Sequence, residues 1–122
     1  MNILDSSCWL EYLSDGKKVK KISQVIENTK ALLVPSISIY EVFKKVLSFS
    51  NENQALQIVA LMQQAKVVDL DISISMLAAK LSLQYKLPMA DSIMLASAKY
   101  YKATLWSFDS DFKNIPGVKY LG

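Results

Sequence analysis

The sequence predicts an α/β fold in which helices cover both faces of a short, mostly parallel central sheet, giving three α/β/α layers. Short apolar runs alternate along the chain with longer segments whose apolar residues recur at helical spacing. This alternation is typical of parallel sheets that are buried on both faces. The chain has 122 residues, of which 52% are apolar, so it is large enough to bury a core. We therefore expect one domain over residues 1–122.

Short apolar runs are predicted to form the strands of this sheet. Most of them end at aspartate or just before proline or aspartate, which are common in the turns that follow strands. Because the apolar residues are continuous rather than alternating with polar ones, we expect the strands to be buried on both faces. The predicted strands are residues 2–5, 31–34, 67–70, 103–108 and 118–121.

The segments between these strands carry apolar residues at the spacing of a helix. Ser6 and Ser36 begin two of them, where a serine hydroxyl can cap free backbone N–H groups. Pro88 suits the first turn of another, since its missing N–H has no partner there. The predicted helices are residues 6–13, 17–30, 36–49, 51–66, 72–85 and 88–102, and residues 109–112 are expected to form a turn or a short helix.

The composition excludes several kinds of catalytic site. The chain has no histidine, which removes the commonest general base, the usual zinc ligand and every Ser-His or Cys-His nucleophile pair. Cys8 is the only cysteine, so we expect no internal disulfide and interpret Cys8 as a core residue. All 14 basic residues are lysines, so phosphate recognition would use ammonium and backbone N–H groups rather than guanidinium forks.

Location is also suggested by absent features. No apolar run approaches the roughly 20 residues of a membrane-spanning helix. Residues 1–5 lack the basic region and the apolar block of a signal peptide. The expectation is therefore a cytoplasmic protein. Its net charge of +3 permits an anionic partner but does not predict one.

One carboxylate stands out because it lies in an otherwise apolar segment. Asp91 belongs to residues 87–98, and no cation lies three or four positions from it on a helix. The helix dipole supplies roughly 0.3–1 kcal/mol at exposed sites, which is less than an unpaired buried carboxylate costs. Something outside this helix must therefore compensate Asp91, and the candidates are the helix N-terminus, a distant lysine or a metal ion.

Other carboxylates are placed where a parallel sheet positions its active site. Asp5 and Asp109 follow predicted strands, and Glu41 lies near the start of a predicted helix. Sites in open parallel sheets lie beyond the carboxyl ends of the strands, so these acids can converge there with Asp91, and Asp111 is close by. Several carboxylates at close range need a countercharge, and oxygen ligands without His or Cys select Mg²⁺ or Mn²⁺. Such sites support phosphodiester hydrolysis.

Four segments hold these acids, namely residues 4–13, 38–42, 87–93 and 105–112. In this order and at these separations, they resemble the PIN-domain family, and specifically the small VapC-type toxins of prokaryotic toxin–antitoxin pairs. Each segment alone is a weak signal, whereas the four together span nearly the whole chain. The resemblance implies a PIN-like fold, an Mg²⁺- or Mn²⁺-dependent endoribonuclease that acts on RNA, a homodimer and inhibition by a cognate VapB-type antitoxin.

The resemblance also assigns roles to the acids. Asp5, Glu41 and Asp91 match the three acids of the family, and by position Asp109 matches the fourth. Asp111 matches a further acid that only some members have. The resemblance therefore implies that all five residues hold metal and that the first four are catalytic.

Four other residues are expected to support this site. Ser6 matches a small hydroxyl residue beside the first acid. Ser107 stands where many relatives have threonine, and it keeps the hydroxyl group. Lys44 and Lys45 lie one turn beyond Glu41, close enough to contact a bound RNA phosphate. The absence of arginine departs from many relatives.

Each candidate also has a structural interpretation. Asp5 can cap a helix, and Glu41 can pair with Lys45 four residues later. Asp91 can interact with the helix dipole, and residues 109–111 can form a plain polar turn.

Two surface features leave alternatives open. The lysine-rich residues 17–21 can be a solvated helix face or a contact for RNA or an antitoxin. The aromatic residues Trp9, Tyr12, Tyr40 and Phe43 are interpreted as packing, which can include the interface of a dimer. Tyr100 and Tyr101 are interpreted as core or interface residues, with base stacking as the alternative.

Two other functions remain alternatives. One is a PIN nuclease for RNA maturation or decay without an antitoxin. The other is a non-catalytic, flavodoxin-like signalling module whose phosphoacceptor would be Asp69 or Asp71, after the third strand. Against the second, the chain lacks the pair of acids that such modules place after their first strand.

Overall fold

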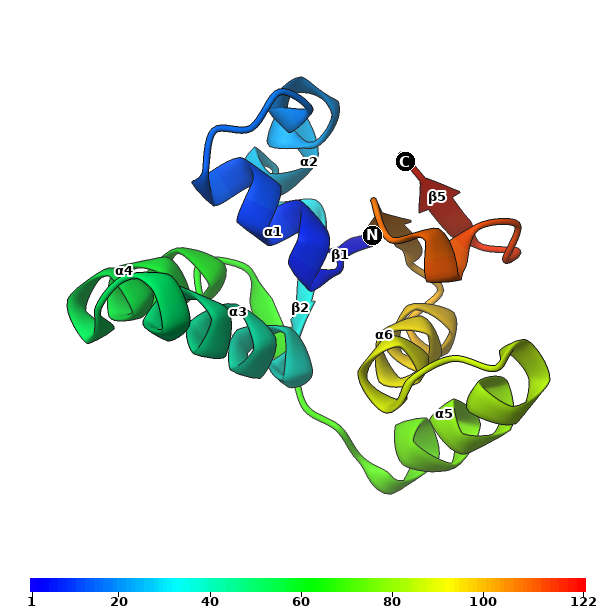
Figure 1. The fold of residues 1–122 in the computed structure, drawn as a ribbon. Helices are drawn as coiled ribbons and strands as arrows, with labels where there is room; N and C mark the ends of the chain where they lie inside the picture. Colours follow the sequence, from blue (N-terminus) through cyan, green and yellow to red (C-terminus); the bar gives the residue numbers. More distant parts are fainter.

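The computed structural model describes residues 1–122 and contains a five-stranded sheet in the order β3-β2-β1-β4-β5 (Figure 1). All pairings between neighbouring strands are parallel. Each strand overlaps the apolar run predicted for it, so the α/β/α class is confirmed, and the sheet is wholly rather than mostly parallel. The strands are β1 (Asn2–Leu4), β2 (Leu32–Pro35), β3 (Lys66–Val68), β4 (Thr104–Ser107) and β5 (Val118–Tyr120).

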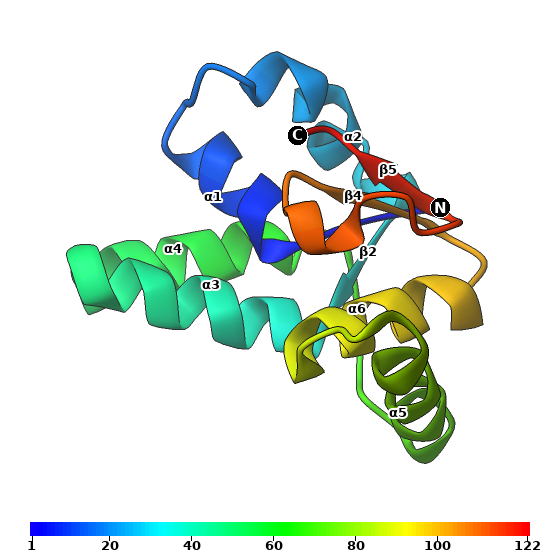
Figure 2. The ribbon, with the colours of Figure 1, turned by 45° about the vertical axis from the view of Figure 1, so that its right-hand side comes forward.

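Helices cover both faces of this sheet (Figures 1 and 2). One face packs against α1 to α4 and the other against α5 and α6. None of the helices has both the length and the apolar character needed to cross a bilayer. The α-helices are α1 (Ser6–Leu13), α2 (Ser23–Glu27), α3 (Ser36–Phe49), α4 (Glu52–Met62), α5 (Ile72–Tyr85) and α6 (Met89–Tyr100), and the 3₁₀ helices are η1 (Val19–Lys21), η2 (Thr29–Ala31) and η3 (Ser110–Phe112).

The continuous helix predicted over residues 17–30 is wrong. The segment is divided into η1, α2 and η2, and the dividing residues Ile22 and Asn28 have φ/ψ angles of −125°/−15° and −86°/72°. Lysines crowded at its start repel one another, and β-branched residues have modest helix propensity. The broken path still buries Ile22 and Ile26 in the core, so their packing outweighs the continuity of one helix.

Other element boundaries differ by a few residues from the predicted ones. Residues 72–85 form α5 as predicted, whereas α4 ends at Met62 and β3 begins four residues later. Ser36 is the first residue of α3 rather than its cap, and Pro35 takes the cap position. Pro88 likewise precedes α6, and its carbonyl accepts the Ser92 N–H at 2.9 Å.

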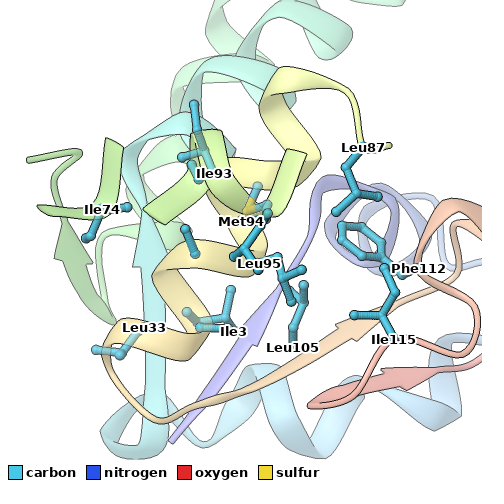
Figure 3. Close-up of a cluster of buried hydrophobic side chains, with 14 of the residues drawn as sticks. Ile3, Leu33, Ile74, Leu87, Ile93, Met94, Leu95, Leu105, Phe112 and Ile115 are labelled. Atoms are coloured by element: carbon cyan, nitrogen blue, oxygen red, sulfur yellow. The ribbon is translucent and has the colours of Figure 1, made fainter. Parts of the chain in front are cut away.

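Successive strand residues enter two different cores, because side chains alternate across a sheet. Ile3, Leu33 and Leu105 face α5 and α6, where Figure 3 shows Met94 and Leu95 of α6 beside Ile3 and Leu105. The residues between them face α1 to α4, and they include Leu4, Leu32 and Val34. Residues 92–98 of α6 are all buried, since this helix packs between the sheet and α5.

The chain reverses its direction of travel across the sheet between β1 and β4. From β1 it proceeds outward to β2 and β3, and it then returns to β4 on the other side of β1. Ligands of open α/β sheets bind outside the carboxyl ends of the strands at such a reversal. The order also differs from the flavodoxin-like order 2-1-3-4-5, so that alternative is wrong. Asp69 is exposed, and Asp71 caps α5 by accepting the Ile74 N–H at 2.8 Å.

Candidate functional site

Asp5 is the buried acid at the centre of the candidate site. It directly follows β1 and caps α1, where its Oδ1 accepts the Cys8 N–H at 3.3 Å and the Ser7 hydroxyl at 2.5 Å. The prediction that Ser6 is the cap is therefore wrong. Since Asp5 is a cap and also lies at the reversal of the sheet, its structural and functional interpretations are compatible.

Ser107 joins the first acid to the turn that holds the fourth. Its hydroxyl donates to Asp5 Oδ2 at 2.5 Å, and its oxygen accepts the Asp109 N–H at 2.9 Å. A second hydrogen bond joins the same two chain segments, since the Ser7 hydroxyl accepts the Phe108 N–H at 3.1 Å. Ser107 is fully buried, so these bonds are shielded from water. The carboxyl ends of β1 and β4 are thereby fixed to each other.

Glu41 reaches the same place from α3. This helix begins directly after β2, so its first turns lie at the edge where Asp5 is found. Glu41 is half-buried, and the nearby Ser6 side chain opposes the rise that burial causes in its pKa. Ser6 therefore supports the second acid rather than capping α1.

Asp91 is brought to the site by a tight connection between α5 and α6. Lys86 ends α5 in the left-handed region with φ of 56°, and the Leu87 N–H donates to the Ser82 carbonyl at 3.2 Å. Leu87 is buried, which anchors the start of α6 against the core. Asp91 lies in the first turn of α6 and is half-buried.

Asp109 and Asp111 form the remaining part of the cluster, on the turn after β4. Asp109 caps η3, and its Oδ1 accepts the Asp111 N–H at 2.9 Å. One carboxylate oxygen from each of Asp91, Asp109 and Asp111 lies within 4.8 Å of the other two, an arrangement that can hold a metal ion.

The charges of the five acids act on one another. Burial raises the pKa of Asp91 to about 7, together with the negative charges of the other four acids, led by Asp109 and Asp111. Burial is also the main cause that raises the pKa values of Asp5 and Glu41. Asp91, Asp109 and Asp111 therefore form one cluster, Asp5 and Glu41 lie near enough for their charges to act on Asp91, and no lysine is among the groups that shift these three pKa values.

This chemistry fits a divalent cation. Asp91 and Asp109 are half-buried and Asp111 is exposed, and a cation at their oxygens would supply the countercharge that these mutually repelling carboxylates lack. Because every donor is oxygen and neither His nor Cys lies among them, the set suits Mg²⁺ or Mn²⁺.

The metal-free protein is expected to become less stable as pH rises. Asp91 has an ordinary pKa of 3.8 and a folded pKa of about 7, so between these values the folded state binds more protons than the unfolded state. Stability therefore falls over this window and stays low above it. In EDTA, the melting temperature should be lower at about pH 8 than at about pH 5, and excess Mg²⁺ should restore part of the loss at about pH 8.

The matched control for this pH dependence is Asp91→Asn, which cannot titrate. Its melting temperature in EDTA should depend less steeply on pH than that of the wild type. A wild-type melting temperature that rises from about pH 5 to about pH 8 in EDTA would contradict the raised pKa values.

The two predicted lysines lie beside the acids but do not belong to their cluster. Lys44 and Lys45 line a surface depression of about 340 Å³ together with Tyr40, Glu41 and Ser48. The predicted ion pair of Glu41 with Lys45 has no support here, because no lysine is among the groups that shift the pKa of Glu41. Both lysines are exposed, so they are free to meet an anionic ligand beside Glu41.

Two residues of this region were missed in the sequence. Ser7 donates a hydrogen bond to Asp5. The sequence pattern that could have revealed Ser7 is a hydroxyl residue in the first turn of a helix that is capped by an aspartate. Tyr40 was interpreted as packing, but it is 58% exposed. Cys8 agrees with its prediction as a core residue, since it is buried and burial raises the pKa of its thiol.

The sequence was compared with protein families and with curated proteins. The model of the PIN domain matches residues 3–118, so the chain belongs to the PIN domain family. No curated protein gives a significant match.

The fold is also similar to solved structures that span nearly the whole chain. A toxin–antitoxin complex from Klebsiella pneumoniae matches with a TM-score of 0.82 at 20% identity, over 98% of this chain and 96% of that one. VapBC2 from Rickettsia felis, bound to a DNA fragment from its promoter, has a TM-score of 0.76 at 14% identity, over 98% and 97%. The sarcin–ricin-loop-cleaving toxin VapC20 of Mycobacterium tuberculosis has a TM-score of 0.72 at 10% identity, over 93% and 92%.

Proposed function

We propose that the chain is an Mg²⁺- or Mn²⁺-dependent endoribonuclease that hydrolyses RNA phosphodiester bonds. The observation that carries the proposal is the meeting of five acids where β1 and β4 end, in a chain of the PIN domain family. The RNA-cleaving toxin among the structures with this fold supports the same substrate class.

The five acids have distinct parts in this proposal. Asp91, Asp109 and Asp111 hold the cation, and Asp5 and Glu41 contribute to one or two ions directly or through water. When bound, the cation activates water and stabilises the departing oxygen of the phosphodiester. Ser107 and Ser7 orient Asp5, so that its carboxylate keeps one position during the reaction.

Lys44 and Lys45 hold the RNA beside these acids. A cluster of negative charges repels a polyanion, and exposed ammonium groups at its rim offset that repulsion. Ammonium groups can contact phosphate as point charges without the fork geometry of arginine.

The experiment that tests the nuclease is cleavage of a mixed pool of structured RNA by the purified protein. We expect cleavage with Mg²⁺ or Mn²⁺ and none with EDTA. Cleavage that persists in EDTA would reject the metal dependence. The absence of both cleavage and metal binding, the latter measured by calorimetry, would reject the nuclease.

We also propose that the chain is the toxin of a type II toxin–antitoxin pair and that a VapB-type antitoxin inhibits it. The antitoxin complexes with this fold support the partner. A pocket of about 280 Å³ between α1, α3 and α4, lined mainly by apolar side chains, offers it a docking surface, with Phe49 exposed at its wall. A small neighbouring gene whose product suppresses the cleavage would support this assignment, and failure of any such product to bind would favour an RNA-processing nuclease.

A homodimer is the third part of the proposal. Ile72, Met76 and Leu83 are exposed on one side of α5, and Met89 is exposed at the start of α6. Exposed apolar patches of this kind mark interfaces. Sedimentation equilibrium measures the oligomeric state, and a monomer at high protein concentration would reject the dimer.

A further inference from the structure

An exposed aromatic ring lies directly before the acid on α3. Tyr40 is 58% exposed, and it lines the same depression as Glu41. Tyrosine has a large apolar ring whose exposure to water costs free energy unless a partner covers it. Its position beside the acids makes a ligand of the site the natural partner.

A lysine is held against this ring. Lys44 Nζ lies 3.5 Å from Tyr40 Oη and 5.6 Å from the centre of the ring. Tyr40 and Lys44 are one helical turn apart, and so are Glu41 and Lys45. The two ammonium groups therefore line the depression one turn further along α3 than the ring and the acid. The two Lys44 distances place its ammonium group beyond the hydroxyl edge of the ring, so both faces of the ring stay open to a planar group.

These groups match the two parts of a nucleotide. A nucleobase is planar and stacks on aromatic side chains, and its phosphate is an anion that an ammonium group attracts. Stacking on a protein ring requires a base that is not already stacked and paired in a duplex. Tyr40 and the lysines therefore favour an unpaired nucleotide beside the acids.

We propose that Tyr40 stacks on an unpaired nucleobase next to the scissile phosphate, while Lys44 and Lys45 contact the flanking phosphates. This inference rests on the proposed nuclease and assigns it a residue that positions the strand. Tyr40 is a positioning residue that sets the register of the strand over the acids. An acidic protein segment is the competing occupant, and it would use the lysines without needing the ring.

The first test compares Tyr40→Ala, Tyr40→Phe and wild type on a short single-stranded RNA that contains a mapped cleavage site. We expect Tyr40→Ala to raise KM about tenfold or more, with a smaller change in kcat, because it removes the stacking surface. Tyr40→Phe should retain KM, since it keeps the ring. The matched control is Tyr100→Ala, which removes a tyrosine that is 49% exposed at the far end of α6 and should leave KM unchanged.

The second test measures stacking without cleavage. A Tyr40→Trp substitution is placed in an Asp91→Asn background, with Mg²⁺ present, and the same background without it corrects for Trp9 and Trp106. Single-stranded RNA should quench the added indole fluorescence, and a duplex of the same sequence should quench it much less.

Wild-type KM in Tyr40→Ala, or equal quenching by the duplex, would overturn the inference while leaving the nuclease intact. If the wild type neither cleaves RNA nor binds metal, the proposed function fails, and the fluorescence test still decides whether the ring binds single strands. Quenching by a poly-glutamate peptide but not by RNA would assign the surface to an acidic protein.

Discussion

An Asp91→Asn variant is expected to lose RNA cleavage by at least about a hundredfold, a typical cost of removing one group that stabilises transition-state charge. In EDTA at about pH 8, the same variant should melt a few degrees above the wild type. Asparagine keeps the shape of the side chain but removes the charge that burial and four neighbouring acids destabilise. Loss of activity with a gain in stability separates a functional acid from a structural one.

The control for this experiment is Asp69→Asn, because Asp69 is an exposed acid outside the cluster. This variant should keep both the cleavage rate and the melting temperature. Initial rates on one RNA and thermal melts in EDTA measure the two effects for both variants. An Asp91→Asn protein that cleaves as fast as the wild type would reject the proposed catalytic role.

A Ser107→Ala variant is expected to lower the free energy of unfolding by about 2–4 kcal/mol. The substitution removes the donor to the buried Asp5 carboxylate and the acceptor of the Asp109 N–H. Each buried group left without a partner costs about 1–3 kcal/mol. Cleavage should also decrease, because Asp5 and the turn that holds Asp109 lose their connection. Urea unfolding at about pH 7 measures the stability change.

Two variants make this result specific to the bridge. Ser107→Thr keeps the hydroxyl and should keep most of the stability and activity. Ser97→Ala removes another buried hydroxyl, which donates only to the Ile93 carbonyl of its own helix at 2.8 Å. That carbonyl also lies in the helical ladder, so the cost should be less than about 1 kcal/mol. Equal losses of stability in Ser97→Ala and Ser107→Ala would show that the hydrogen bonds of Ser107 contribute no more than a hydroxyl bond within one helix.

Much of the fold was predictable because its signals are local. Buried parallel strands appear in the sequence as continuous apolar runs, and the helix predicted over residues 72–85 has the bounds of α5. Residues 17–30 carry the same apolar spacing, yet the segment is broken. Whether one helix or three short ones bury Ile22 best depends on the surfaces of α1 and the sheet, and the segment's own sequence does not contain that information.

The candidate site was likewise predictable only in part. The five acids were recognisable from their places after strands and near helix starts, and the structure brings them together. Ser107 was predicted to support the site, but its hydrogen bond to Asp5 and the bond of Phe108 to Ser7 were not predicted, because each joins residues about a hundred positions apart. Tyr40 was misassigned because helical periodicity places it at the border of the apolar arc, where burial depends on neighbouring helices.

The bonds between the ends of β1 and β4 also have a consequence for synthesis. β1 is the central strand, and its register pairs Ile3 with both Leu33 and Leu105. On a translating ribosome, β1 therefore cannot pair with β4, its second neighbour, until residues 104–107 have been synthesised. Until Ser107 emerges, Asp5 has no partner at Oδ2 and the acids of the last turn are absent. A nascent chain consequently has no assembled site until residues 104–111 have emerged from the ribosome.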